Sequence, residues 1–310
     1  FLKNLNKDNI NQTSNEMKSG EVCLIENIRF QKEEENIDLN FAKNLSSLFD
    51  VYVNDAFSAS HRNHTSIIGF AKFLPAVAGN NLVKEINSIN FFLQNLKKPN
   101  TAIIGGSKIS TKIKLLNNLI EKFNTIVVGG AMANTFLLAN KINISKSLVE
   151  ENLIIDALNI QQKAKKLNCK LILPVDVVCA NKIQDKNPVY CKIEEVPSGL
   201  KILDLGKVTT KLINEEIIKS RMVLWNGPVG AFEYKPYDEA TNGIAKTIKL
   251  NAKKFNIKTL AGGGDTVSAI NNTKSESGFT YISNAGGAFL EWLEGNESPG
   301  VIALKENKFI

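Results

Sequence analysis

The segment Thr101-Ala102-Ile103-Ile104-Gly105-Gly106-Ser107-Lys108 decides how this chain folds. Its first residues predict a buried strand, and the two glycines then end that strand. Apolar side chains recur three and four positions apart between Ile113 and Phe123, which predicts a helix after the turn. A strand that passes through a glycine turn into a helix is the repeating unit of a mainly parallel sheet.

The same unit recurs along the chain. Short apolar runs predict strands at residues 22–25, 51–53, 101–104, 125–128, 170–173, 222–225, 258–261 and 280–283. Helix-length segments separate several of these runs. We therefore expect an α/β fold with a parallel sheet covered on both faces, and ligands that bind beyond the carboxyl ends of its strands.

Composition limits the class of protein. The chain has 310 residues, 43% of them hydrophobic, which favours two domains. The net charge of +7 comes from dispersed lysines without interleaved aromatic residues, so we expect no nucleic-acid binding. No apolar run approaches the roughly 20 residues that cross a bilayer, and no signal peptide is evident. We expect a cytoplasmic protein without membrane contact, whose four cysteines, none in a CxxC pair, stay reduced.

Two segments suggest the domain organisation. Residues Leu82 to Leu96 predict one amphipathic helix that connects two domains, whereas Asn181 to Gly206 predicts an irregular excursion with short strands. We expect an N-terminal domain at residues 1–78, the connecting helix at 79–98 and a C-terminal domain at 99–298. A tail at residues 299–310 is expected to return towards the N-terminal domain.

Four predicted strands end in small residues, at positions 104–108, 128–131, 261–266 and 283–288. Glycines at such junctions let backbone N–H groups and helix N-termini approach a phosphate. One junction is weak support, because glycine also serves tight turns. Four favour a shared nucleotide or phosphate site. No Walker-type loop and no dinucleotide fingerprint is present, which disfavours an NAD-dependent dehydrogenase. Fluorescence transfer from Trp225 or Trp292 to NADH would test that alternative.

Three lysines follow the first junction. Lys108, Lys112 and Lys114 are expected in the first turns of the next helix, where each cation opposes the macrodipole by roughly 0.3–1 kcal/mol. That conflict favours a bound anion. Lys108 and Lys112 are four residues apart and would project from one helix face towards a polyphosphate. The alternative is exposed lysines in a lysine-rich chain.

Gly264-Asp265-Thr266 offers a complementary group at the third junction. An aspartate that faces phosphates requires a cation between them, so Asp265 is a candidate magnesium ligand. The same motif is equally typical of a helix N-cap, and both interpretations stay open.

Only three of the 38 basic residues are arginines, namely Arg29, Arg62 and Arg221. A guanidinium grips phosphate or carboxylate with a two-pronged fork that lysine lacks, so these positions are candidate anion sites, with a purely structural role as the alternative. His61 and His64 flank Arg62. They lack neighbouring ligands for a zinc shell, and a hydrogen-bonding wall for an anionic substrate is the preferred interpretation.

Six ordered motifs resemble those of the phosphoglycerate kinase family, and the resemblance extends over essentially the whole chain. They are LIENIRF (24–30), YVNDAF with HRNH (52–57 and 61–64), GGSKISTK (105–112), WNGPVGAFE (225–233), GGGDT (262–266) and GGAFLE (286–291). The resemblance implies two doubly wound parallel-sheet domains that face each other across a helical hinge, with the N-terminal domain incomplete. The acid would bind to the N-terminal domain and the nucleotide to the C-terminal domain.

The resemblance also implies roles for single residues. Arg29 and Arg62 would grip 3-phosphoglycerate, Lys108 would stand beside the transferred phosphoryl group, and Lys112 would bind the nucleotide phosphates. The residues implied to hold the remainder of the nucleotide are Glu233 at the ribose, and Gly263, Gly264, Asp265 and Thr266 at the phosphates and magnesium.

The implied reaction belongs to glycolysis and gluconeogenesis. ATP and 3-phosphoglycerate would exchange a phosphoryl group to give ADP and 1,3-bisphosphoglycerate, with Mg²⁺ as cofactor and the chain as a monomer. The acceptor carboxylate is already ionised, so no general base is needed, and the site must supply alignment, charge neutralisation and domain closure.

Two departures from the family pattern bear on function. The last junction reads Asn284-Ala285-Gly286-Gly287, where the family commonly has Thr followed by three glycines, and we expect binding to survive this small methyl group. The family motifs RVDFNVP and SHLGRP are not in the sequence, which does not begin with Met. In the family these motifs lie in roughly the first 80 residues and contribute to substrate binding. We therefore expect a chain that binds ATP or ADP but turns over very slowly or not at all, or alternatively a non-catalytic nucleotide-binding remnant.

Overall fold

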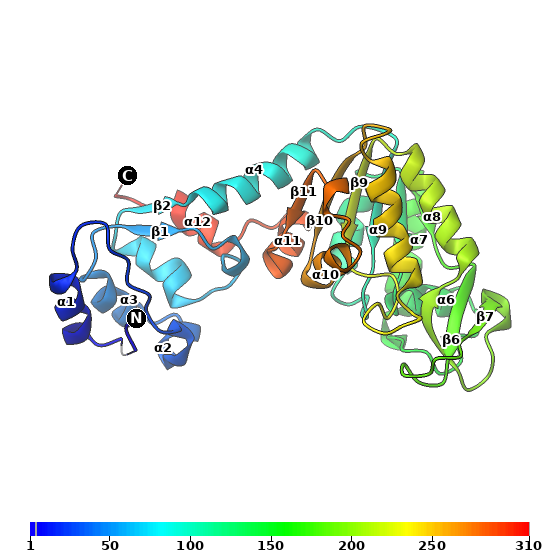
Figure 1. Cartoon of the computed structure of the whole chain (residues 1–310), viewed down its shortest axis with the longest axis horizontal. Helices are drawn as coiled ribbons and strands as arrows, with labels where there is room; N and C mark the ends of the chain where they lie inside the picture. The colour runs from blue at the N-terminus through cyan, green and yellow to red at the C-terminus, as the bar shows by residue number, and fades with distance from the viewer. Residues whose placement is uncertain (4, 310) are drawn as a thin grey trace. The chain divides into compact units, whose positions relative to one another are not determined.

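The structure is a computed structural model that describes residues 1–3 and 5–309. The chain forms two compact units, one made of Phe1–Asn87 with Asn296–Ile310 and the other of Ser88–Gly295. Helix α4 (Asn80–Gln94) contributes residues to both units (Figure 1). The sequence placed this helix at Leu82 to Leu96, two residues later.

The strands are β1 (Tyr52–Asn54), β2 (Ala76–Ala78), β3 (Asn100–Ile104), β4 (Thr125–Val128), β5 (Lys170–Ile172), β6 (Asp176–Ala180), β7 (Val189–Lys192), β8 (Lys201–Leu205), β9 (Met222–Asn226), β10 (Lys258–Gly262) and β11 (Tyr281–Ser283). The other α-helices are α1 (Lys7–Glu16), α2 (Lys32–Glu35), α3 (Leu39–Ser46), α5 (Ile113–Ile120), α6 (Met132–Ala139), α7 (Ile154–Lys166), α8 (Lys207–Lys219), α9 (Glu239–Asn251), α10 (Gly264–Asn272), α11 (Gly286–Leu293) and α12 (Pro299–Lys305). Short 3-10 and π turns η1 to η7 connect some of them.

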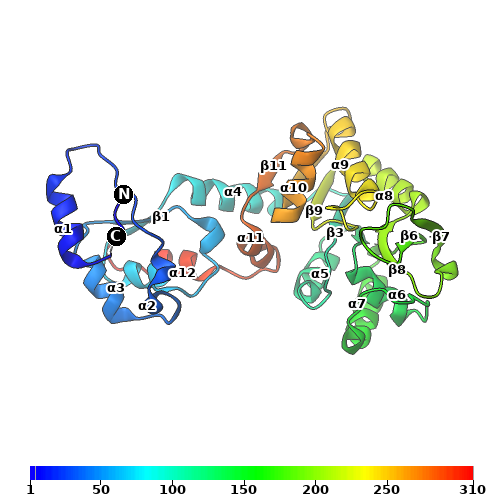
Figure 2. The same cartoon turned by 60° about the horizontal axis from the view of Figure 1, so that its bottom comes forward.

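The unit Ser88–Gly295 is built on a parallel sheet of six strands in the order β11-β10-β9-β3-β4-β5. Helices α5, α6 and α7 cover one face and α8, α9 and α10 the other (Figure 2). Every residue of β3, β4 and β9 is buried, as expected of strands covered on both faces. The predicted α/β class is therefore confirmed.

The hydrophobic core between the sheet and helices α8 and α9 explains why the strands carry large apolar side chains on this face. Ile103, Val223 and Trp225 point to this face and pack with isoleucines that recur at helical spacing, namely Ile213, Ile217, Ile244 and Ile248. The Trp225 ring also stacks on Phe279, with 6.3 Å between ring centroids. This packing fixes β9 at the centre of the sheet, and it therefore also fixes where the turn that follows Asn226 begins.

A second, three-stranded antiparallel sheet in the same unit has the order β7-β6-β8. The sequence predicted short strands between Asn181 and Gly206, and β7 and β8 lie there. Strand β6 was not predicted, although four of its five residues are buried. Its C-terminal partner β8 leads directly into α8, so this sheet borders the carboxyl edge of the larger one.

The unit that contains both chain ends has a two-stranded parallel sheet, β1 and β2. Helix α12 packs in this unit, where the Gly300 N–H donates to the Ser60 carbonyl at 2.9 Å and the Asn307 amide donates to the carbonyls of Ala71 and Leu74. One strand prediction was wrong here. Within residues 22–25 only Ile25 forms a bridge, to Leu2, and Val22 and Leu24 are exposed. No strand in the described part of the chain pairs with this segment.

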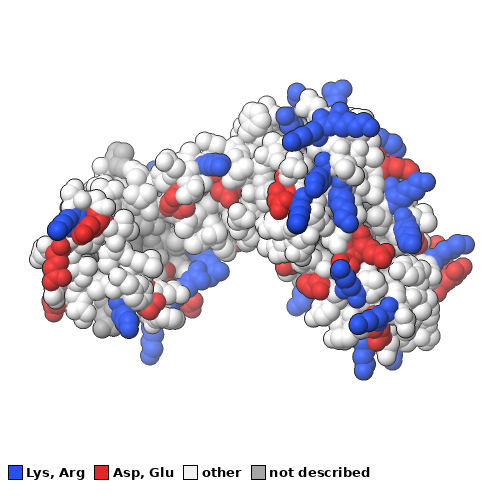
Figure 3. Space-filling model, viewed as in Figure 1, with Lys and Arg blue, Asp and Glu red and all other residues white. Residues whose placement is uncertain are grey.

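No helix among the described residues is long and apolar enough to cross a membrane. Acidic side chains lie among the lysines and arginines on the face shown in Figure 3.

Candidate nucleotide site

The turns after β3, β4 and β9 meet through their backbones at the carboxyl edge of the six-stranded sheet. A methyl group on Gly105 would overlap the Pro228 carbonyl oxygen, and one on Gly227 would overlap the Gly105 carbonyl oxygen. One on Gly130 would lie 2.5 Å from the Gly106 oxygen. The Gly105 N–H also donates to the carbonyl of Asn226, the last residue of β9, at 2.9 Å. Glycine is therefore required at these positions by the contact of one backbone with another.

A cavity of about 340 Å³ opens beside these turns. Gly106 and Gly130 line it from the turns, and Leu203 lines it from β8. Glu233 and Asp265, two of the sequence-predicted nucleotide ligands, line the same cavity although they follow different strands. A cavity bounded by backbone and by three carboxyl groups, those of Asp204, Glu233 and Asp265, is suited to a polar ligand that carries its own cation.

Lys112 reaches the same edge from the first junction. It is the N-cap of α5, and its ammonium donates to the Asn226 side-chain oxygen at 2.6 Å. The predicted geometry of Lys108 and Lys112 on one helix face is wrong, because residues 105–112 form the turn and the helix begins only at Ile113. Lys108 is exposed on that turn and is not among the residues that line the cavity.

Asn226 connects the junctions to one another. It is 2% exposed, and besides accepting from Lys112 it donates to the Gly262 carbonyl at 2.8 Å. The Gly227 N–H donates to the hydroxyl of Thr266, which is fully buried, at 2.7 Å. The network thus joins the ends of β3, β9 and β10. Sequence reasoning assigned no role to Asn226, although a polar residue at the end of an apolar strand was a usable signal.

Burial lowers the pKa of Lys112 from 10.5 to about 8, and the nearby carboxylates of Glu294 and Asp265 oppose that shift only partly. The hydrogen-bond partner of its ammonium is a neutral amide, and no ion pair among the described residues involves Lys112. A bound anion would stabilise the charged form of this partly desolvated lysine, so the residue is a good candidate for binding one.

The third junction turns at Gly263, whose φ of +103° places it in a conformation that favours glycine. Gly263 is the N-cap of α10, so Asp265 lies inside the first turn and is not the N-cap residue. Asp265 is exposed, and no hydrogen bond or ion pair between described residues holds its carboxylate. A methyl group on Gly264 would meet no atom within 4 Å.

The fourth junction does not reach the cavity lining. Ala285 is the N-cap of α11 and is 2% exposed, so its methyl group points into the protein. Gly286 follows it and, like Gly264, faces open space. The methyl group of Ala285 is therefore accommodated behind the turn, and Gly286 keeps open space in front of it.

Glu150 anchors the lysine-bearing turn, a role that the sequence did not reveal. Its carboxylate accepts from the Ser110 N–H at 2.9 Å and from the Ser110 hydroxyl at 2.7 Å. Although its partial burial acts the other way, these bonds and the Lys108 charge lower the pKa of Glu150 below its ordinary value. Ser110 stands between Lys108 and Lys112, so this bidentate contact fixes the turn that carries both.

Asp204 forms a buried wall of the cavity. It is 2% exposed and accepts from the N–H groups of Leu205 and Ala240 at 2.9 and 3.0 Å. Burial raises the pKa of Asp204 well above its ordinary range despite these donors. A methyl group on Gly230 would overlap its carboxylate, so Asp204 packs directly against the loop that leads to Glu233.

The predicted acid-binding residues lie in the other unit. Arg29 is exposed on η1 (Ile28–Phe30), whereas Arg62 is half-buried after η2 (Phe57–Ala59). The Arg62 Nε and the His61 Nδ1 are buried without a hydrogen-bond partner among the described residues. His64 instead lies 3.6 Å from the buried Glu34 carboxylate. Among the described residues, no group of three or more His, Cys, Asp or Glu side chains could hold a metal ion.

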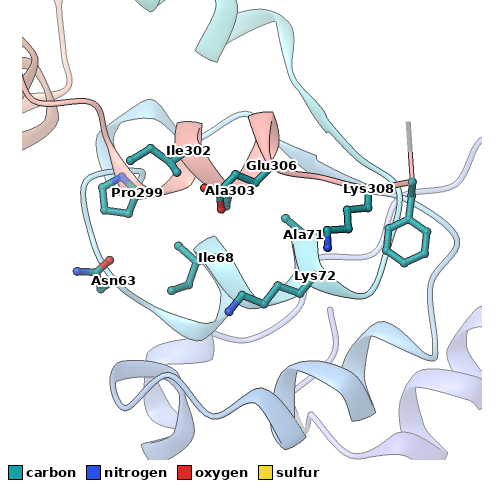
Figure 4. Close-up of a pocket in the computed structure, with 10 residues that line it drawn as sticks. Asn63, Ile68, Ala71, Lys72, Pro299, Ile302, Ala303, Glu306 and Lys308 are labelled. Atoms are coloured by element: carbon teal, nitrogen blue, oxygen red, sulfur yellow. The ribbon is translucent and has the colours of Figure 1, made fainter.

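A larger cavity of about 880 Å³ lies in the unit that contains both chain ends, between η3 (Thr65–Gly69), η4 (Phe70–Lys72) and α12 (Figure 4). Ile68, Ile302 and Pro299 supply apolar walls, and Lys72 and Lys308 project from opposite sides. No sequence-predicted site residue lines it. Size alone therefore does not identify the functional site, and the smaller cavity with its converging junctions is the better candidate.

Comparison with known proteins points to one family. A sequence model of the family described as "Phosphoglycerate kinase" matches residues 1–296. A phosphoglycerate kinase of Caulobacter vibrioides is 47% identical over 292 residues, which are 94% of this chain and 74% of that protein. A phosphoglycerate kinase of Bartonella bacilliformis is 43% identical over 94% of this chain and 73% of its own length.

Solved structures give the same result. The phosphoglycerate kinase from Coxiella burnetii matches with a TM-score of 0.83 at 37% identity, over 93% of this chain and 73% of that one. The enzyme from Pyrococcus horikoshii matches with a TM-score of 0.82 at 27% identity, over 98% of this chain and 77% of that one.

Proposed function

This chain belongs to the phosphoglycerate kinase family, and we propose that it transfers the terminal phosphoryl group of ATP to the carboxylate of 3-phosphoglycerate, reversibly. The observation that carries this proposal is the network at the sheet edge, in which Lys112, Asn226 and Thr266 tie three strand ends together beside one cavity. A kinase of this kind needs aligned substrates and neutralised charge rather than a proton acceptor.

The nucleotide would lie along the cavity of the unit Ser88–Gly295. Glu233, which lines the cavity, would accept hydrogen bonds from ribose hydroxyls. Lys112 would meet the phosphates, since its charge is largely buried and has no ion-pair partner in the described part of the chain. The open space at Gly264 and the N-terminus of α10 would admit phosphate oxygens to backbone N–H groups.

The donor set fits magnesium that arrives with the nucleotide. Asp265 offers one exposed carboxylate at the cavity, and the described residues provide no complete metal shell. Magnesium commonly keeps several waters and binds one or two carboxylates together with substrate phosphates. Asp265 would hold it, and the ion would neutralise charge on the phosphates.

The acid would bind in the unit that contains both chain ends. Arg62 supports this placement, because its buried Nε has no partner among the described residues and a guanidinium suits phosphate or carboxylate. His61 adds a second unpaired buried nitrogen next to it. Arg29 would contribute from η1, where its side chain is exposed.

Lys108 would act on the transferred group. It is exposed on the turn that Glu150 anchors through Ser110, so its ammonium can reach a phosphoryl group that lies in front of the turn. Charge stabilisation by a positioned lysine is strongest where closure excludes water.

Calorimetry with ATP and magnesium, and a coupled phosphoryl-transfer assay on the same preparation, test the proposal. We expect ATP binding that Lys112→Met weakens at least tenfold, and transfer that Lys108→Met or Arg62→Gln abolishes. Binding without any transfer would favour the alternative of a non-catalytic nucleotide-binding protein. Absence of ATP binding would overturn the site assignment altogether.

A further inference from the structure

A second cavity in the unit Ser88–Gly295, of about 610 Å³, lies at the opposite edge of the six-stranded sheet. It is lined by the first residues of three adjacent strands, Met222 of β9, Lys258 of β10 and Tyr281 of β11, together with the C-terminal part of α4. Strand β10 separates Lys258 from the glycine turn at Gly262, a span of about 13 Å at roughly 3.3 Å per residue. The cavity is therefore separate from the candidate nucleotide site.

Three cations converge on this cavity, Lys97, Arg221 and Lys258, and none of the described residues that line it is acidic. Their backbones are hydrogen-bonded to the same strand starts. The Lys258 N–H donates to the Arg221 carbonyl at 2.9 Å, and the Lys97 N–H contacts the Met222 sulfur at 3.0 Å. No ion pair between described residues involves any of the three. Like charges held together without a counter-ion form an environment that attracts an anion.

Aromatic side chains form the other part of the lining. Phe91 on α4 is 70% exposed and Phe255 is 46% exposed, whereas Phe92 and Met222 are buried beneath them. Large exposed aromatic residues beside a concave surface are typical of binding sites. A flat apolar group can lie against these rings while its charge meets the cations.

Arg221 is the cation in this cavity that is best suited to recognise a planar anion. It is one of only three arginines, and the proposed phosphoryl transfer uses Arg29 and Arg62 but not Arg221. A planar guanidinium both pairs with a carboxylate, sulfonate or phosphate and stacks on an aromatic ring, which lysine does less well.

We propose that this cavity binds a small organic anion with an aromatic body, at a site separate from the nucleotide. The anionic group pairs with Arg221 and Lys258, and the aromatic body packs on Phe91 and Phe255. The volume is in the range of roughly 300–1,000 Å³ typical of small-molecule sites. The convergence of three cations around a concave space favours a compact anion over a macromolecular partner.

Titration of the full chain with 8-anilinonaphthalene-1-sulfonate, an aromatic sulfonate, in excess MgATP tests the proposal. We expect one bound probe per chain, with fluorescence that MgATP does not displace. Arg221→Gln should weaken probe binding by about tenfold, the effect of losing one charge-assisted hydrogen bond. Phe91→Ser should weaken it independently of ionic strength, and both side chains are exposed enough for the fold to survive.

Lys186→Gln is the matched control, because it removes one exposed positive charge outside the cavity. It should leave probe affinity unchanged. Equal losses in Lys186→Gln and Arg221→Gln, or displacement of the probe by MgATP, would overturn the proposal. Probe binding that responds to Phe91→Ser but not to Arg221→Gln or salt would also overturn it, since the surface would then be merely apolar.

Discussion

The ammonium of Lys112 lies 2.6 Å from the side-chain oxygen of Asn226, at the end of the central strand β9. This contact positions the lysine without neutralising it, because an amide carries no charge. Burial then lowers the Lys112 pKa to about 8. In the absence of nucleotide, the Lys112 ammonium is therefore partly desolvated and is available to bind an anion.

The first prediction concerns protons. Near pH 8 about half of the free protein should carry a neutral Lys112, and bound phosphates should restore its charge. ATP binding should then take up about half a proton per site, measured by calorimetry in buffers of different ionisation enthalpy. Lys112→Arg cannot lose its proton and is the control. Equal uptake by this variant would place the titrating group elsewhere.

A second prediction concerns stability and pH. The folded-state pKa of Lys112, about 8, lies below its ordinary value of 10.5, so the unfolded chain binds more protons between these two values. The stability of the wild type relative to Lys112→Met should therefore rise as the pH increases from about 8 to about 10.5. Urea unfolding of both proteins at pH values on either side of this window measures the difference. A constant or falling difference would contradict the shift.

Gly105 and Gly264 should respond differently to substitution by alanine. Gly105→Ala places a methyl group against the Pro228 carbonyl and should cost at least about 2 kcal/mol of unfolding free energy. Gly264→Ala meets no atom, so its Tm should change little. ATP affinity should nevertheless fall about tenfold in Gly264→Ala, if phosphate occupies that space. Wild-type affinity would show that the phosphates lie elsewhere.

Glu150 provides a test of loop positioning. Glu150→Gln preserves the shape of the side chain but weakens both bonds to Ser110, so ATP affinity should fall several-fold without a matching loss of Tm. The neighbouring Glu151→Gln, an exposed residue, should have no effect. The lowered pKa of Glu150 also predicts a pH dependence. The ionised carboxylate stabilises the folded protein above the ordinary glutamate pKa, and this stabilisation is lost as the pH falls through the lower pKa of the folded state.

Local patterns predicted the sheet well, since residues buried on both faces leave a clear apolar run. The prediction for β4, residues 125–128, coincides with the observed strand. The run at residues 22–25 shows the limit, because a strand also needs a neighbour, and pairing partners are not visible in a local pattern. Strand β6 was missed because its pairing is not visible locally either. Its partners β7 and β8 follow it in the chain and are separated from each other by an irregular segment.

The site was less predictable than the sheet. The glycine turns, Glu233 and Asp265 were visible as motifs, and the structure brings their junctions to one edge. The roles of Asn226 and Glu150 depend on partners 114 and 40 residues away in sequence, which no local spacing reveals. The supposed pairing of Lys108 with Lys112 failed because the turn extends to residue 112, four residues beyond where a helix face was assumed.

The interlocked turns after β3, β4 and β9 have an evolutionary consequence. The surface they offer to a ligand consists largely of peptide groups, whose chemistry is identical in every protein. A mutational bias towards lysine, asparagine and isoleucine can therefore change most outward-facing side chains here without changing that surface. Mutation of Gly105, Gly130 or Gly227 to a larger residue would alter it directly, so purifying selection on these few codons contributes strongly to preserving the architecture of the site.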